Sequence, residues 1–86
     1  ILGAGSGGIS VASRLKGSLP AGAVAIMDPS DFHFYQPLWT LVGAGVVDND
    51  RTKKPMQDLI PDGIQWIKES VRSIDVQGKK VTSSSG

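Results

Sequence analysis

Three glycines near the start of the chain, Gly3, Gly5 and Gly8, have the Gly-x-Gly-x-x-Gly spacing of a turn that binds phosphate groups. In such a turn the first glycine allows the sharp change from strand to helix. The second lets the backbone approach a diphosphate closely, and the third lets the helix pack tightly on the strand. The helix presents unpaired N–H groups and its positive dipole end to the phosphates. The spacing therefore predicts a site for a dinucleotide.

Asp28 is the second part of this pattern that could do chemistry. It ends an apolar run at 23–28 and lies twenty residues after Gly8. From this position a carboxylate can accept hydrogen bonds from the hydroxyl groups of a ribose, but it repels a 2′-phosphate. The three residues that follow include no lysine or arginine that could pair with such a phosphate. The sequence thus disfavours NADP and leaves FAD and NAD open.

The elements that must position these residues occur in the right order. Residues 1 and 2 have the character of a strand end, residues 7–16 have helical apolar spacing, and residues 23–28 resemble a strand buried on both faces. Strand, glycine turn, helix and strand together predict a Rossmann-like βαβ unit with a right-handed crossover. We expect Gly17 to end the helix in left-handed backbone.

Short elements are expected in the rest of the chain. The patterns predict a loop at 29–37, a short helix or packed apolar segment at 38–45, an exposed polar loop at 46–54, one helical turn beginning at Pro55, and a small β meander within 63–82. The fold class is therefore α/β, with the meander following the βαβ unit.

The composition excludes several classes of function. The 86 residues are 40% hydrophobic and 20% charged, and their net charge of +1 gives no strong field to attract nucleic acid. The chain has no cysteine and one histidine, so thiol catalysis and disulfides are excluded from it, and no metal site is predicted. The longest apolar run, at 38–47, is shorter than the roughly twenty residues of a membrane-spanning helix.

A longer stretch of the chain resembles a known family. The residues GAGSGG at 3–8 and AIMDPSDFHFYQPLWTLVGAG at 25–45 resemble the N-terminal FAD-binding region of sulfide:quinone oxidoreductases, most closely the mitochondrial type. The resemblance continues through IPDGIQWIKESVRSID at 60–75 and is most specific at 33–45. These enzymes are flavoproteins with two dinucleotide-binding domains, a group that includes the type II NADH dehydrogenases. The resemblance therefore favours FAD.

The resemblance also implies roles for individual residues. Residues 5–8 would hold the FAD diphosphate, and Asp28, where the family often has glutamate, would bind the adenosine ribose. Gln36 would contact the flavin nucleotide, and the main chain of Val71 would meet the edge of adenine. The expected cofactor-binding residues are Gly3, Gly5, Ser6, Gly7, Gly8, Asp28, Gln36 and Val71.

Several of these roles have a structural alternative. Ser6 is compatible with being only a small residue in the turn, because backbone N–H groups do most phosphate binding. Gln36 is compatible with tying together the loop between two prolines, and Val71 with a place in a strand core.

The sequence favours structural roles for His33 and the two tryptophans over roles in catalysis or flavin stacking. Histidine is a common general base, but His33 has no catalytic partner nearby and lies in the packing sequence FHFY. A structural role is therefore favoured. Trp39 and Trp66 are more typical of core or subunit contacts than of stacking on a flavin.

The resemblance implies an enzyme activity for the complete protein. A pair of redox cysteines would take up sulfide sulfur, FAD would pass two electrons to ubiquinone, and an acceptor such as glutathione or sulfite would receive the sulfur. The 86 residues contain no cysteine. We therefore expect 1–86 to be the N-terminal part of an FAD/NAD(P)-binding domain that does not catalyse alone.

The resemblance further implies a place in the mitochondrial inner membrane, reached through parts of the protein outside these residues. Two other readings stay open at this point. The chain could be the FAD-binding part of a type II NADH:quinone dehydrogenase, or a nucleotide-binding module without catalysis.

Overall fold

The start of the chain forms the strand, turn, helix and strand that the sequence predicts. In the computed structural model, which describes residues 1–86, Leu2 makes a parallel bridge to Met27. Helix α1 (Ser6–Lys16) connects this single bridged residue, which stands where the first strand is expected, to strand β1 (Ala25–Met27). The parallel pairing across a helical connection is the βαβ arrangement that the apolar patterns predict.

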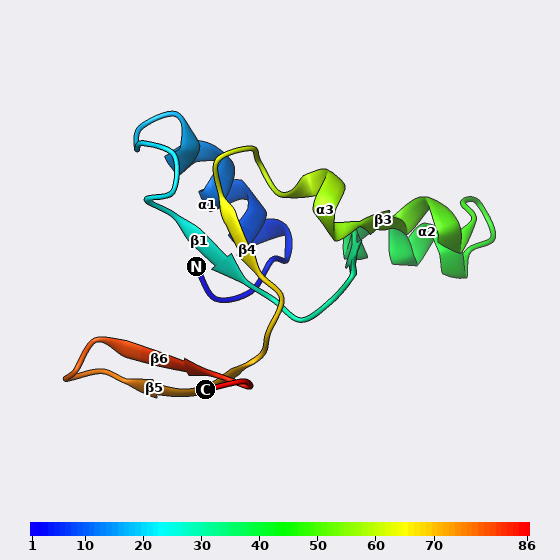
Figure 1. The fold of residues 1–86 in the computed structure, drawn as a ribbon. Coiled ribbons are helices and arrows are strands. Elements are labelled where there is room, and N and C mark those ends of the chain that lie inside the picture. The colour runs from blue at the N-terminus through cyan, green and yellow to red at the C-terminus, as the bar shows by residue number, and fades with distance from the viewer.

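A further parallel strand, β4 (Gln65–Ile67), pairs with β1 so that Ile26 lies opposite Trp66. Figure 1 shows α1 lying against this small sheet. Ala12 of α1 and Ile26 of β1 are completely buried. Because alanine is small, α1 approaches the sheet closely. The core cluster consists of Ala4, Ala12, Ile26 and Met56.

The end of α1 differs from the expectation. Gly17 has φ −74° and is right-handed, so the prediction of left-handed backbone there was wrong. The N–H groups of Ser18 and Leu19 both donate to the carbonyl of Leu15, each at 3.0 Å. These bonds close the helix without a left-handed residue. The first glycine after α1 with left-handed backbone is Gly22, with φ +84°, in the turn that precedes β1.

The middle of the chain contains a pair of strands where the sequence predicts only loops. Strand β2 (Phe32–Phe34) pairs antiparallel with strand β3 (Lys53–Pro55). His33 of β2 is buried between two exposed phenylalanines, and Thr52, just before β3, is completely buried. The expectation of two loops was wrong because each strand is three residues long and its partner lies far away in the sequence.

Short helices connect these strands. Helix α2 (Trp39–Gly43) confirms the expected helix in the apolar segment, and α3 (Met56–Leu59) confirms the helical turn after Pro55. Two 3-10 turns, at Gln36–Leu38 and Asn49–Thr52, precede α2 and β3. None of the helices has the length and apolar content to cross a membrane.

The last strands form a hairpin rather than the expected meander. Strands β5 (Val71–Asp75) and β6 (Lys80–Ser83) pair antiparallel with each other in a sheet of their own. Because β4 is paired with β1, it does not join β5, and the meander prediction was wrong. Figure 1 shows the hairpin extending away from the βαβ unit, and every residue of β5 is exposed.

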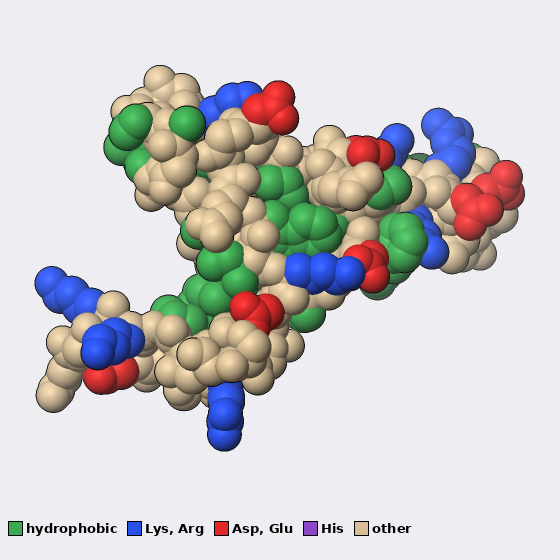
Figure 2. Space-filling view, in the orientation of Figure 1, with side chains coloured by type: hydrophobic (Ala, Val, Ile, Leu, Met, Phe, Trp, Pro, Cys, Tyr) green, Lys and Arg blue, Asp and Glu red, His purple; other side chains and the backbone are tan.

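The surface has a mixed distribution of charge. Figure 2 shows hydrophobic side chains gathered in the middle of one face, with basic and acidic side chains interspersed around them. One surface ion pair joins Lys68 to Asp31. Exposed pairs of this kind contribute only about 0–1 kcal/mol, so this pair adds little to the stability of the fold.

Glu69 joins the two ends of the hairpin. Its carboxylate accepts hydrogen bonds from the Ser85 N–H at 3.0 Å and the Ser83 hydroxyl at 3.1 Å. Hydrogen bonding from Ser85, together with that from Ser83, lowers the pKa of the Glu69 carboxyl below its ordinary value, against the opposing effect of desolvation. The ionised form therefore holds the hairpin end in place.

We expect the hairpin end to loosen as the pH falls through the lowered pKa of Glu69. A carboxylate with a lower pKa in the folded state stabilises the fold above its unfolded pKa, and this contribution is lost at lower pH. The protection of the Ser85 amide against hydrogen exchange should be complete above the ordinary pKa of a glutamate, about 4.3, and should fall as the pH drops below it through the lowered pKa of Glu69. Glu69→Gln should remove this dependence. The same fall in protection in both proteins would contradict the assignment.

Candidate functional site

Helix α1 begins directly on the glycine turn. Gly3 has φ +98°, a left-handed conformation that glycine adopts at little cost. A Cβ at Gly8 would lie 1.9 Å from the carbonyl oxygen of Gly3, so only glycine lets the helix begin this close to the strand. A Cβ at Gly5 or Gly7 would meet no atom within 4 Å. The turn is therefore tight on its protein side and open on its outer side.

The backbone N–H groups of residues 5–8 have no acceptor within the protein. The first helical hydrogen bond runs from the Ile9 N–H to the Gly5 carbonyl at 3.0 Å. No side chain caps the helix, and its first turn has no acidic residue. Unpaired amides and the positive end of the helix dipole favour an anion at this position.

Asp28 directly follows β1 and is held by its neighbours. Its Oδ2 accepts the Ala4 N–H at 2.9 Å, and its Oδ1 accepts the Ser30 N–H at 2.8 Å. The Trp66 indole donates to its backbone carbonyl at 3.0 Å. An ionised carboxylate has about four acceptor positions, so these bonds fix its orientation and leave capacity for two hydroxyl groups.

Two hollows that share residues bring the expected site together. The first, of about 190 Å³, is lined in part by Gly5, Asp28 and Gln36. The second, of about 500 Å³, is lined in part by Gly5, Ser6 and Gln36. Phe34 borders both. Gly5, Asp28 and Gln36 therefore border one hollow, and Ser6 borders the other. Gly3, Gly7 and Gly8 of the glycine turn line neither.

The sequence reasoning missed Ser30 and Phe34, which border the same space. Ser30 orients the carboxylate of Asp28 two residues before it, a short-range turn that the order Asp-Pro-Ser is able to form. Phe34 carried no such signal, because its position depends on the pairing of β2 with β3.

Gln36 and Val71, the two residues whose roles come from the family resemblance, are placed differently. Gln36 begins the 3-10 turn after β2, and the Tyr35 N–H anchors that turn by donating to the Thr52 carbonyl at 2.8 Å. Val71 lies in the hairpin, lines neither hollow and has 36% of its surface exposed.

Comparison with known proteins identifies the family. No protein-family model matches the sequence. The mitochondrial sulfide:quinone oxidoreductase of Mus musculus is 42% identical over 86 residues, which is 100% of this chain and 19% of that protein. The enzyme of the same name from Dictyostelium discoideum is 47% identical over 72 residues, 83% of this chain and 16% of that protein. The 86 residues belong to the sulfide:quinone oxidoreductase family.

Two further comparisons agree with this assignment. The mitochondrial sulfide:quinone oxidoreductase of Schizosaccharomyces pombe is 32% identical over 102 aligned positions, covering 100% of this chain and 22% of that protein. The crystal structure of the sulfide:quinone oxidoreductase from Aquifex aeolicus matches 99% of this chain and 20% of its own, with a TM-score of 0.72 and 22% identity, and so has the same fold. The chain spans about a fifth of the length of these relatives.

In this sulfide:quinone oxidoreductase segment, His33 and the tryptophans have structural contacts. His33 is 8% exposed, and its Nδ1 lies 3.1 Å from the Ala4 carbonyl, its one hydrogen-bond partner. Trp66 packs against the core cluster. Trp39 is exposed and meets the ring of Phe34 edge-on at 6.4 Å. The contacts of His33 and Trp66 agree with the packing roles favoured from the sequence, whereas Trp39 is not a core residue of these 86 residues.

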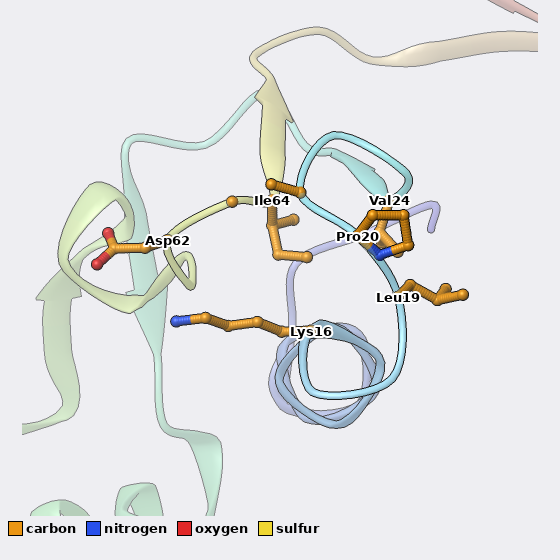
Figure 3. Close-up of a pocket in the computed structure, with 8 residues that line it drawn as sticks. Lys16, Leu19, Pro20, Val24, Asp62 and Ile64 are labelled. Carbon is orange, nitrogen blue, oxygen red and sulfur yellow. The ribbon is translucent and has the colours of Figure 1, made fainter.

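A separate pocket lies at the opposite end of α1 in this member of the sulfide:quinone oxidoreductase family. Figure 3 shows Lys16, Leu19 and Ile64 around it. Its volume is about 130 Å³, and none of the expected cofactor-binding residues lines it. It is therefore not part of the site at the glycine turn.

Proposed function

We propose that these residues bind FAD as the N-terminal part of an FAD/NAD(P)-binding domain in a larger sulfide:quinone oxidoreductase. The full protein would oxidise sulfide to sulfane sulfur and pass the electrons through FAD to ubiquinone. One observation carries the proposal: Gly5, whose N–H is unpaired, and Asp28 border the same hollow at the start of α1, in a chain similar over its whole length to named sulfide:quinone oxidoreductases.

The residues fit the adenosine diphosphate half of FAD. The N–H donors of residues 5–8 are suited to the negative charge of a diphosphate, and the open space beside Gly5 allows the diphosphate to approach. Asp28 retains acceptor positions for the ribose hydroxyl groups, and the amide of Gln36 borders the same space. When bound, FAD supplies the two-electron chemistry, while these residues hold and orient it.

The roles of the remaining groups follow from the family. The main chain of Val71 is a proposed contact to the adenine edge, made from the hairpin. Because the 86 residues contain no cysteine, the redox cysteines that take up sulfide belong to other parts of the protein. Those parts would also carry the quinone site and the association with the mitochondrial inner membrane, with glutathione or sulfite accepting the sulfur.

The proposal is tested with the purified full-length protein. We expect a yellow protein whose flavin absorbance is bleached by sulfide without oxygen and restored by a soluble ubiquinone analogue. Bleaching by NADH but not by sulfide would instead indicate a type II NADH:quinone dehydrogenase. Bleaching only by dithionite would indicate a nucleotide-binding module without this catalysis.

Gly5→Ala should weaken FAD binding while leaving the fold intact. A Cβ at this position meets no protein atom, and the φ of −72° suits alanine, so the fold accommodates the methyl group. The same methyl group enters the space assigned to the diphosphate. We expect the Kd for FAD to rise about three- to tenfold, with a melting temperature of the FAD-free protein close to that of the wild type. An unchanged Kd would remove Gly5 from the proposed site.

A further inference from the structure

His33 makes a buried hydrogen bond to the glycine turn that its packing role alone does not require. His33 is 8% exposed, and its Nδ1 lies 3.1 Å from the carbonyl oxygen of Ala4, a residue that is 1% exposed. A carbonyl oxygen can only accept, so Nδ1 carries the proton. The contact therefore fixes both the orientation of the ring and its tautomer.

The carbonyl that accepts this bond belongs to the same peptide unit as the Gly5 N–H. The backbone has no cis peptide bond, and in a trans unit the C=O and N–H groups point in opposite directions. Because the Ala4 carbonyl points at His33, the Gly5 N–H points away from the ring. That N–H has no acceptor in the protein, and Gly5 borders both hollows.

A hydrogen bond to a peptide carbonyl also polarises the peptide unit. Hydrogen bonds in a chain strengthen one another, so an N–H whose own carbonyl is hydrogen-bonded becomes a better donor. The preceding peptide unit is held as well, because the Ala4 N–H donates to Asp28 Oδ2 at 2.9 Å. Ala4 is thus fixed on one side by His33 and on the other by the acid assigned to the ribose.

We infer that His33 is a positioning residue for the diphosphate: through the Ala4 carbonyl it aims and strengthens the Gly5 N–H as a donor to a phosphate oxygen. This inference rests on the proposed function, because it assigns the same turn to the FAD diphosphate. His33 also borders the smaller hollow, but the role assigned to it acts through the Ala4 carbonyl and involves no proton transfer with a substrate. Its effect is on how tightly the anion is held.

The test uses the full-length protein, stripped of flavin, with ADP and adenosine competing against FAD. His33→Leu fills the buried site with an apolar side chain and removes the donor. We expect it to weaken ADP about three- to tenfold and adenosine less than about twofold, because only ADP carries a diphosphate. His33→Asn places an N–H near the position of Nδ1 and should restore ADP binding to within about twofold of the wild type.

A matched control is available at Thr52. Thr52 is also buried and polar, but its hydroxyl donates to the Asn49 carbonyl at 2.7 Å, and it borders neither hollow. Thr52→Val should lower the melting temperature without changing the ratio of ADP to adenosine affinity. This ratio separates a positioning effect from a general loss of stability.

The outcomes distinguish the inference from the proposed function. If the wild type binds FAD and His33→Leu weakens ADP and adenosine equally, or leaves ADP unchanged, His33 is only a packing residue. Failure of His33→Asn to restore ADP binding overturns the inference in the same way. If the wild-type protein itself takes up no FAD, the proposed function fails first.

Discussion

Replacing Gly8 with alanine is expected to lower the free energy of unfolding of the full-length protein by about 3 kcal/mol. The added methyl carbon would lie 1.9 Å from the Gly3 carbonyl oxygen and 3.0 Å from the Gly3 carbonyl carbon. Both are backbone atoms, so no side chain can rotate to make room. Either α1 moves away from the short strand, or the turn at Gly3 opens.

The control for this change is the adjacent Gly7→Ala. A Cβ at Gly7 meets nothing within 4 Å, and alanine stabilises a helix relative to glycine by about 0.5–1 kcal/mol. In denaturant unfolding of the FAD-free proteins, the free energy of unfolding of Gly8→Ala should therefore be well below that of the wild type. That of Gly7→Ala should equal or exceed the wild-type value. Equal stability of the two variants would show that α1 does not pack on the turn as the structure has it.

Asp28→Ala is expected to produce the largest loss of FAD. A hydrogen bond to a charged group contributes about 1.5–3 kcal/mol, so losing the ribose contact should raise the Kd for FAD about 10- to 150-fold. The measurement is the flavin retained by the full-length protein on dilution. Full retention of flavin by Asp28→Ala would show that the carboxylate does not hold the ribose.

Two comparisons separate binding from folding in this experiment. Asp28 also accepts the N–H groups of Ala4 and Ser30, so the melting temperature of the FAD-free variant must be measured beside the Kd. Asp31→Ala removes a nearby carboxylate that pairs only with Lys68 at the surface, and we expect its Kd to stay within about twofold of the wild type. A loss of FAD as large in Asp31→Ala would point to a general charge effect.

We expect acid to affect the order of the hairpin more than the hydrogen-bond donors of the glycine turn. The Glu69 contacts lie at the end of the hairpin, whereas the glycine turn and Asp28 lie in the βαβ unit. Acidification toward the lowered pKa of Glu69 should therefore loosen the hairpin without removing the donors at residues 5–8. If Val71 contacts adenine from the hairpin, acid should weaken ADP binding in the wild type more than in Glu69→Gln.

The sequence by itself determined the βαβ unit and its candidate ligand. The glycine turn, α1 and the strand ending at Asp28 are neighbours along the chain, so their spacing and apolar periodicity carry the information. The family resemblance then named Gln36, which the structure brings to the same hollow as Gly5 and Asp28. No local pattern placed it there.

Only the tertiary structure decided the pairing of β2 with β3, the parallel pairing of β1 with β4, and the contact of His33 with Ala4. Strands β2 and β3 are three residues long, too short for an alternating pattern to mark them. Strands β1 and β4 lie in segments that the sequence predicts to be extended, but no pattern shows that they pair with each other. The contact between His33 and Ala4 spans 29 positions of the chain. Short strands and distant partners leave no local trace, because the free energy that selects them comes from burial and hydrogen bonds made after the chain has folded back on itself.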